Sequence, residues 1–449
     1  MKTLRPLPEV EISMSNTYKL SEVFSRGMPT VTYVHREDLG LERSLQDAVA
    51  KGYAIVAITG PSKCGKTVLR RQVIPDGSVV KIEGGQVTAE ADFWDAIRAH
   101  VGAAASRSES AAKQTGGSAG LSGGINIGIA RLGASYVESD GSSRSETRSY
   151  TGPQKGELLT RLREMNDVLV VDDFHYIPER IRSSIVRALK SAVFDGLCVV
   201  MLSVPYRAFD VLSAEPEMEG RFSHLPIPAW DPADLLKIAK QGFPAMGLGV
   251  DQQIQHTLAD DALGSPLLMQ SLCAELCVQL GVRTTESPPC VIEPGYVDLP
   301  RLYQSIALDF GLPAFQKLSA GPQSRTDRIP RPFVNGNSGD IYEAVLAALA
   351  YSGAAEKTSY DDLRSALRDI LTNAVPQKHE VTRSIVQMCD IAKKMQVKKA
   401  LQRDAEAEDT DSNVEIPPID WKDDQIIIND VFLRFYLRWV HRPAVAPPA

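Results

Sequence analysis

Two groups of residues in this chain of 449 have the types and spacing needed to bind phosphate and a metal ion. The first is Gly60, followed after four residues by Gly65, Lys66 and Thr67; it comes after the apolar run 54–58 and before a helical pattern. Glycines at these positions let backbone N–H groups surround an anion, and the helix that follows points its positive end at the same anion. The pattern is that of a phosphate-binding loop, in the strand-to-helix context that such a loop requires.

The cofactors implied by this loop are ATP or ADP, together with Mg²⁺. Lys66 is expected to reach the β- and γ-phosphates, and the Thr67 hydroxyl is expected to hold Mg²⁺. The neighbouring residues are expected to surround the phosphates mainly through their backbone. The predicted nucleotide-binding residues of the loop are Gly60, Pro61, Ser62, Lys63, Cys64, Gly65, Lys66, Thr67 and Val68.

The second group is the pair Asp172-Asp173, which ends the apolar run 168–171. Two adjacent carboxylates at the end of a buried strand repel each other, so the pair calls for a positive partner. Asp172 is predicted to hold Mg²⁺ from the end of a neighbouring strand, and Asp173 to orient or deprotonate the attacking water. His175 follows closely, either as part of this site or as a histidine packed locally at the start of a helix, and the sequence leaves both open.

The 106 residues from Lys66 to Asp172 are too many for two strand–helix units of about 30 residues each. Residues 105–152 account for the surplus, because 23 of these 48 residues are Gly, Ser or Thr. Inside them the stretch GGINIGIARL alternates apolar and other residues as a strand does. The sequence therefore predicts a flexible insertion that contains a hairpin.

Alternating strand and helix patterns over residues 53–205 predict a parallel sheet with the nucleotide at the carboxyl ends of its strands. At the end of the last of these strands, Ser203 is expected to sense the γ-phosphate. Arg207 and Arg221 follow, each either a catalytic arginine that enters a neighbouring subunit's nucleotide site or a member of a surface ion pair. The other expected elements are a strand at 78–83 and helices at 89–101, 154–165 and 179–194.

The composition is that of an ordinary globular protein, with 43% hydrophobic and 23% charged residues. A formal net charge of −7 argues against general affinity for nucleic acid, although a local basic face is compatible with it. The sequence has no run of eighteen apolar residues, and its first residues, MKTLRPLPEVEISM, lack the apolar core of a signal peptide. We therefore expect a cytoplasmic protein without membrane contact.

The chain resembles the AAA+ superfamily and, within it, the STAND switch ATPases and the initiator-type, origin-recognition-like ATPases. The resemblance covers roughly residues 28–280 and rests on TYVHREDLGLERSLQDAV, GPSKCGKT, VLVVDDFH, LSVPYR, EGRFSHLPIPAW and ALGSPLL. It implies nucleotide contacts from Arg36 and from Pro266, which opens a helix of a small helical lid. The lid turn has this proline but no arginine, and the acidic pair is Asp-Asp rather than Asp-Glu, which is more similar to slow switches than to fast motors.

The expected fold class is α/β: a parallel-sheet P-loop NTPase core of the ASCE/AAA+ type, a helical lid and a C-terminal winged-helix-like α+β domain. The last domain is expected from three helices at 339–353, 359–371 and 380–401, followed by a strand and a helix within 421–440. The third helix carries a basic group that either contacts DNA phosphates or is simply solvated, formed by Lys393, Lys394, Lys398, Lys399 and Arg403. The expected division is an N-terminal segment at 1–28, the ATPase core at 29–228, the lid at 229–290 and the winged-helix-like domain at 291–445.

Three hypotheses on function follow. The first is a slow ATP-dependent switch that forms homo-oligomers through its ATPase core in the ATP state. Because no effector domain is recognisable in the sequence, this switch is expected to regulate a separate effector protein, and the resemblance suggests prokaryotic defence or a mobile element as the setting. The second is an initiator- or transposition-regulator-like ATPase acting on duplex DNA. The third is a scaffold that holds ADP without turnover.

Overall fold

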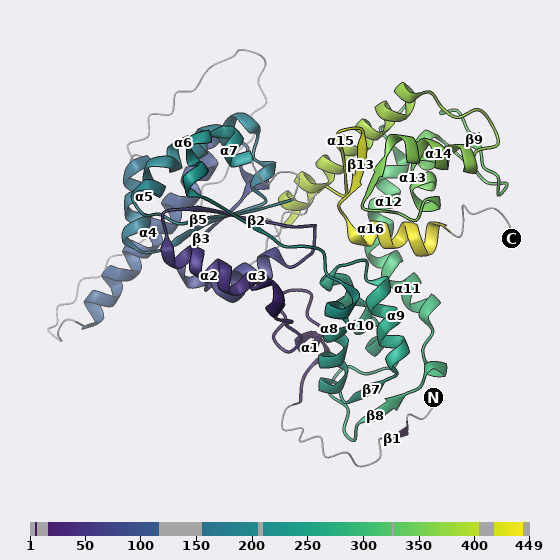
Figure 1. The fold of residues 1–449 in the computed structure, drawn as a ribbon, viewed down its shortest axis with the longest axis horizontal. Coiled ribbons are helices and arrows are strands. Elements are labelled where there is room, and N and C mark those ends of the chain that lie inside the picture. Colours follow the sequence, from purple (N-terminus) through teal and green to yellow (C-terminus); the bar gives the residue numbers. More distant parts are fainter. Residues whose placement is uncertain are drawn as a thin grey trace, which may run out of the picture.

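The computed structural model describes residues 5–6, 17–115, 155–204, 210–325, 327–403 and 417–442, and the statements below concern these parts of the chain. Figure 1 shows a unit built on a sheet, a helical unit that begins near α8, and a third unit that includes α13 to α15. Among the described residues, no helix combines the length and the apolar character needed to cross a bilayer.

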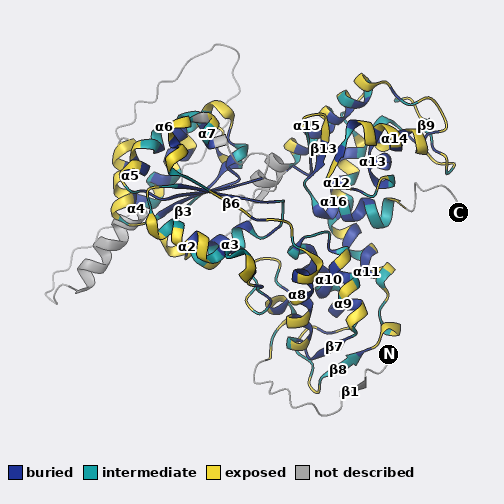
Figure 2. Ribbon diagram, in the orientation of Figure 1, coloured by how far each residue is buried: buried dark blue, intermediate teal, exposed yellow. Residues whose placement is uncertain are grey.

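The first unit is built on five parallel strands in the order β3-β4-β5-β2-β6. β2, β4 and β5 are buried along their whole length, as Figure 2 shows in dark blue, because helices cover both faces of the sheet. This confirms the expected parallel sheet of a P-loop NTPase. The strands are β2 (Ile55–Thr59), β3 (Val79–Glu83), β4 (Val168–Asp172), β5 (Val199–Ser203) and β6 (Phe222–Pro226).

The strand order corrects one expectation. β4, which ends in Asp172, does not lie beside the P-loop strand β2, because β5 pairs with both of them and separates them. The sequence indicates where each strand begins and ends. The order depends on the side to which each crossover helix returns, here α6 (Glu179–Phe194), and no local pattern records that choice.

Alternate residues of each strand face different layers of helices. Ile55 packs in a cluster with α4 (Glu90–Thr115) and α5 (Lys155–Glu164), whereas Val56 packs in a second cluster that includes α2 (Leu41–Lys51) and α3 (Lys66–Val73). The short helix α7 (Asp210–Ala214) also contributes to the first cluster. The sheet is therefore the middle of three layers, with the phosphate-binding loop at one end of it.

Helix α4 is longer than expected. The sequence predicted a helix at 89–101 and a flexible insertion from residue 105, but α4 continues to Thr115. The alanine-rich segment 103–112 explains the extension, because alanine is the strongest helix former. The hairpin expected in GGINIGIARL lies outside the described residues.

The lid has a core of its own. Its three main helices, α8 (Pro232–Ala245), α9 (Gln252–Asp261) and α10 (Pro266–Gln279), pack with α1 (Leu20–Val23) and α11 (Leu299–Ile306). Ser265 caps α10, since its Oγ accepts a hydrogen bond from Leu268 N at 3.3 Å, and Pro266 is the first residue of the helix as expected. Beside these helices lies a small sheet formed by β7 (Leu248–Val250), β8 (Cys290–Ile292) and β1 (Arg5–Pro6).

The C-terminal unit contains the three expected helices, α13 (Ile341–Tyr351), α14 (Tyr360–Ile370) and α15 (Lys378–Arg403). Residues 419–428 form a hairpin of two strands where a single strand was expected, and a third strand between α13 and α14 was missed because it is only three residues long. The assignment as a winged helix and the four domain boundaries stay predictions. The strands are β11 (Lys357–Ser359), β12 (Ile419–Lys422) and β13 (Gln425–Ile428).

Helix α16 (Val431–Tyr436) connects the lid to the C-terminal unit, because its side chains belong to the buried clusters of both. It packs closely against Gly311, which ends the π-helical turn Ala307–Gly311 before α12 (Leu312–Ala320). A Cβ atom at Gly311 would lie 2.4 Å from Phe432 O and 2.5 Å from Tyr436 Cβ. Only glycine, which has no side chain, allows this contact.

We expect the replacement Gly311→Ala to destabilise the protein by about 1–3 kcal/mol, because overpacking against backbone outweighs the better helix propensity of alanine. The replacement Gly102→Ala, in helix α4, is the matched control, because a Cβ there meets nothing within 4 Å. It should leave stability unchanged or raise it by about 0.5–1 kcal/mol. Thermal unfolding of both variants measures the difference, and equal melting temperatures would contradict the close approach of α16.

Candidate functional site

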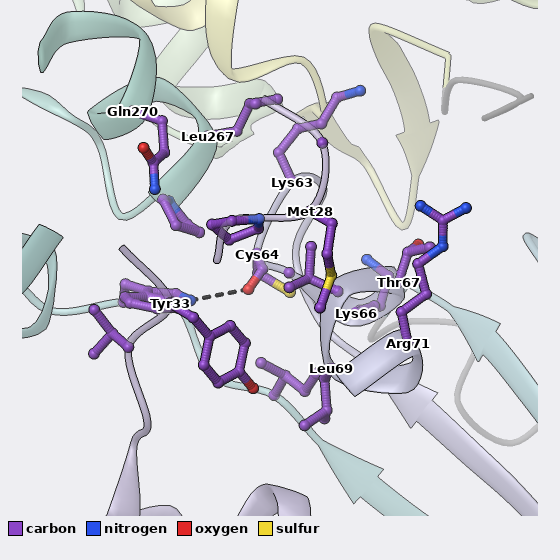
Figure 3. A pocket seen from close by; sticks show the side chains of 18 of the residues that line it. Met28, Tyr33, Lys63, Cys64, Lys66, Thr67, Leu69, Arg71, Leu267 and Gln270 are labelled. Carbon is purple, nitrogen blue, oxygen red and sulfur yellow. Dashed lines mark hydrogen bonds between the residues drawn. The ribbon is translucent and has the colours of Figure 1, made fainter. Parts of the chain in front are cut away.

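A cavity of about 260 Å³ opens at the carboxyl ends of the strands, where the P-loop meets the lid. It is lined by the loop and the start of α3, by residues of the N-terminal segment 25–36, and by the start of α10. Figure 3 shows Lys66, Thr67 and Arg71 on one side of this cavity and Leu267 and Gln270 on the other. The residues predicted to bind nucleotide from three separate parts of the chain thus come together around one space.

Two glycines allow the P-loop to take its shape. A Cβ at Gly60 would lie 2.7 Å from Cys64 Sγ and 2.8 Å from Ile227 O, so any side chain there would displace the loop. Gly65 has φ 99°, a left-handed conformation at the N-cap of α3 that favours glycine. The loop therefore closes tightly on itself and presents the N-terminus of α3 to the cavity.

Lys66 lies over the P-loop, and Thr67 lies beside Asp172. The Lys66 ammonium donates hydrogen bonds to Gly60 O at 2.9 Å and to Pro61 O at 2.8 Å, so it lies over the loop. The Thr67 hydroxyl donates to Asp172 Oδ2 at 3.3 Å, although the two residues are 105 positions apart. A hydroxyl and a carboxylate oxygen side by side are the hard oxygen ligands that Mg²⁺ prefers, so these residues fit that ion.

Asp173 lies beside this pair in a buried, strained position. Its backbone is left-handed, with φ 52° and ψ 41°, which aspartate tolerates better than most residues. Burial raises the pKa of Asp173 well above its usual range, and the charge of Asp172 raises it further, whereas Lys66 partly opposes both effects. A carboxylate with raised proton affinity next to a phosphate-binding loop suits a general base.

Glu83 and Gly84 also belong to the site, although their sequence pattern did not single them out. Glu83 ends β3 directly opposite Asp172 in the sheet register, is buried, and pairs with Lys81 Nζ at 2.5 Å. A Cβ at Gly84 would lie 2.3 Å from Asp173 O, so glycine is required for the turn after β4 to pass this close. The sequence shows Glu-Gly-Gly at the end of a predicted strand. Only the register of the sheet shows that these residues lie beside the acidic pair.

Ser203 ends β5, between the P-loop strand and the strand of the acidic pair. Its carbonyl accepts a hydrogen bond from Gly60 N at 3.3 Å, and its hydroxyl lies 3.4 Å from His175 Nδ1. The His175 ring also packs against Tyr176, with centroids 4.1 Å apart, so His175 contacts both a predicted site residue and its chain neighbour. His224 of β6 was not singled out from the sequence, and it lies 2.7 Å from the Thr59 hydroxyl at the end of β2.

Arg36 is buried at the junction of the N-terminal segment and the lid. Its guanidinium donates to Asp234 Oδ2 at 3.1 Å and to the carbonyl of Pro228 at 3.1 Å, and it lies 5.1 Å from the centre of the Trp230 ring. These contacts anchor the base of α8, so Arg36 borders the cavity while its donors are directed at protein groups. Its role in binding nucleotide stays a prediction.

Two further contacts join the lid to the P-loop. Trp230 Nε1 donates to Cys64 O at 2.9 Å, the bond drawn as a dashed line in Figure 3, and the Ser265 hydroxyl lies 3.5 Å from Lys63 O. Pro266 follows Ser265 in the cavity wall. Trp230 lies in the stretch EGRFSHLPIPAW, but nothing in its neighbours indicated that it would reach the loop.

Arg221 lies at the amino ends of the strands, whereas the P-loop lies at their carboxyl ends. Arg221 comes directly before β6, whose first residue, Phe222, pairs with Ile55 at the amino end of β2. Its guanidinium lies 4.0 Å from the centre of the Phe194 ring. The length of β2 therefore separates Arg221 from the P-loop of the same chain. A catalytic role for Arg221 would require the nucleotide site of another copy. Arg207 lies outside the described residues.

No protein-family model matches the sequence, and no curated protein matches it. Among solved structures, a Walker-type ATPase of Pyrococcus abyssi is similar with a TM-score of 0.50 and 11% identity, over 92% of this chain and 99% of that chain. The Orc2 protein of Aeropyrum pernix, in ADPNP and ADP complexes, gives 0.45 at 12% identity over 95% and 98% of the two chains. The Orc1 protein of the same organism, in complex with DNA, gives 0.42 at 13% identity over 84% and 88%. At such identities the likeness to the first of these is one of fold, and it shows that the chain has the fold of a Walker-type P-loop ATPase.

Proposed function

We propose that this protein binds ATP with Mg²⁺ and hydrolyses it slowly. The observation that carries the proposal is the 3.3 Å contact between the Thr67 hydroxyl and the Asp172 carboxylate, at the foot of a cavity bounded by the P-loop. Bound Mg²⁺ would neutralise charge on the β- and γ-phosphates, with Thr67 and Asp172 holding it. The remaining residues of the site then have distinct tasks.

The Lys66 ammonium would move from the loop carbonyls to the phosphates and stabilise the charge that develops on them. Asp173 would orient the attacking water and accept its proton, which its raised pKa favours. Ser203 borders both the loop and the acidic turn through Gly60 N and His175, a position suited to sensing the γ-phosphate.

We further propose that nucleotide turnover operates a switch in which ATP promotes self-association and the protein regulates a separate partner. Support comes from a small pocket in which Pro61 and Ser62 of the P-loop lie with Glu356, Lys357 and Asn429 of the C-terminal unit. The loop and the C-terminal unit therefore line the same space. Arg221, which comes before β6 at the end of the sheet away from the P-loop, is proposed to act on the site of an adjacent copy.

A second candidate function is the initiator- or transposition-regulator-like ATPase on duplex DNA. The observation that favours it is the exposure of Lys378, Arg383, Lys393 and Lys394 along α15. Lys398, Lys399 and Arg403 continue the same helix, although their side chains lie outside the described set. Positive side chains along one helix are the usual means of contact with phosphate backbone.

Lys66→Ala and Asp173→Asn should separate binding from hydrolysis. We expect Lys66→Ala to weaken ATP binding about 30- to 100-fold, because charge-assisted bonds to the phosphates are removed. We expect Asp173→Asn to bind ATP normally and to hydrolyse it about 10²- to 10⁴-fold more slowly. Calorimetric titration and phosphate release measure the two effects.

Lys240→Ala and Asp47→Asn are the matched controls for these variants, because both residues are exposed on helices away from the cavity. Both should behave as the wild type. Unchanged ATP affinity in the Lys66→Ala protein would overturn the proposed binding site, and normal hydrolysis by Asp173→Asn would remove Asp173 from the reaction.

Arg221→Ala should lower ATP hydrolysis by up to about 10³-fold without affecting binding, since an arginine acting between subunits contributes to the transition state alone. Mixing it with Asp173→Asn should restore part of the activity, because an intact P-loop site of one copy then meets an intact arginine of the other. Arg43→Ala, an exposed arginine on α2, is the control. Failure of the mixture to regain activity would contradict action between subunits.

The second candidate predicts retention on duplex DNA that requires ATP and weakens with salt. Replacing Lys393 and Lys394 together by alanine should reduce the slope of log affinity against log salt by about one for each phosphate that is no longer neutralised. Fluorescence anisotropy over a salt series measures this slope, with Lys240→Ala as the control. Absence of binding at low salt would exclude the second candidate.

A further inference from the structure

Phe194 is a large apolar residue that remains at the surface of the ATPase core. It is the last residue of α6, and 45% of its surface is exposed. The two residues before it, Ala192 and Val193, are buried in the cluster that covers one face of the sheet. The core therefore fixes the end of α6, while the Phe194 ring itself stays open to other groups.

The guanidinium of Arg221 lies over this ring, with its central carbon 4.0 Å from the ring centre. The face of an aromatic ring attracts a cation through its partial negative charge. Among the described residues, no carboxylate pairs with Arg221 and no carbonyl accepts a hydrogen bond from it. Two glutamates of the preceding segment, Glu215 and Glu217, pair with Lys190 instead. The described part of the chain thus provides no ion pair for Arg221.

The backbone on both sides of Arg221 is also held in place. Arg221 ends the helical turn Pro216–Arg221, in which Met218 is fully buried, and Phe222 then pairs with Ile55 in the sheet. The long arginine side chain could otherwise take many rotamers, and ordering it on binding costs free energy. A ring that holds the guanidinium beforehand lowers this cost and leaves the N–H donors available for an anion.

We propose that Phe194 is a positioning residue, which holds the Arg221 guanidinium ready for the nucleotide of an adjacent copy. The inference rests on the proposed function, because it assumes that Arg221 acts on the site of that copy. The N–H donors that the ring contact leaves available suit the negative charge on a γ-phosphate during transfer. Arg221 and the P-loop lie at different ends of the strands, so the contact joins two different surfaces of the two copies. Phe194 therefore affects turnover in the adjacent copy and leaves ATP binding unchanged.

The test introduces Phe194→Leu into one of two mixed proteins at a time. In a mixture of Asp173→Asn with Arg221→Ala, the first protein supplies Arg221 and the second supplies an intact nucleotide site. Adding Phe194→Leu to the protein that supplies Arg221 should lower the regained turnover about 3- to 30-fold, because a cation–π contact is lost. Adding it to the protein that already lacks Arg221 should cost nothing further. Phosphate release at saturating ATP measures turnover, and calorimetric titration should show the same ATP affinity throughout.

Two single replacements separate the ring face from apolar surface in general. Phe194→Tyr keeps an aromatic face and should keep turnover close to that of the wild type, whereas Phe194→Leu keeps only the bulk. Tyr53→Leu is the matched control and should leave turnover unchanged. Tyr53 has 52% of its surface exposed, and its ring lies beside Gly196 rather than under a cation.

Unchanged turnover in Phe194→Leu would overturn the proposal, and so would an equal loss whichever of the two mixed proteins carries the replacement. A loss in Tyr53→Leu as large as that in Phe194→Leu would assign the effect to exposed apolar surface and would equally remove the role of the ring. If Arg221→Ala hydrolyses ATP as fast as the wild type, or if the mixture regains no activity, the assumed action between copies fails. That result is distinct from a loss in Arg221→Ala that Phe194→Leu does not share.

Discussion

The site depends on the register of three buried parallel strands. Thr59 at the end of β2 is level with Ser203 of β5, and β5 in turn aligns with β4, which ends at Asp172. Because the strands end together, a hydroxyl that follows β2 and a carboxylate that ends β4 come within 3.3 Å across the intervening strand. A shift of one residue in the pairing of β4 would turn Asp172 to the other face of the sheet.

That register gathers three buried carboxylates, of which Asp172 and Asp173 border the cavity. Glu83, Asp172 and Asp173 are all buried, and among the nearby positive groups are Lys66, from the loop, and Lys81, beside Glu83. Burial raises the pKa of Asp173, and the neighbouring charge of Asp172 raises it further. Holding these carboxylates together destabilises the fold, and a bound cation would offset their repulsion.

The lid and the N-terminal segment convert this edge of the sheet into an enclosed cavity. Arg36 holds the base of α8, Trp230 reaches the Cys64 carbonyl, and Gln270 bonds to Thr32. Each contact joins segments about 165 or more residues apart in the chain. Ser62 of the loop and Lys357 of the C-terminal unit line one small pocket, so the loop also borders the third unit.

The sequence by itself determined the local features of this protein: the loop from Gly60 to Thr67, the acidic pair, the buried strands, and the start of α10 at Pro266. These follow from glycine freedom, apolar runs and capping, which act over a few neighbouring residues. The position of β5 between β2 and β4, the approach of Gly84 to Asp173 and the bond from Trp230 to the Cys64 carbonyl were decided by the tertiary structure alone. Each depends on groups brought together from distant parts of the chain by the packing of whole layers, and no local spacing encodes that outcome.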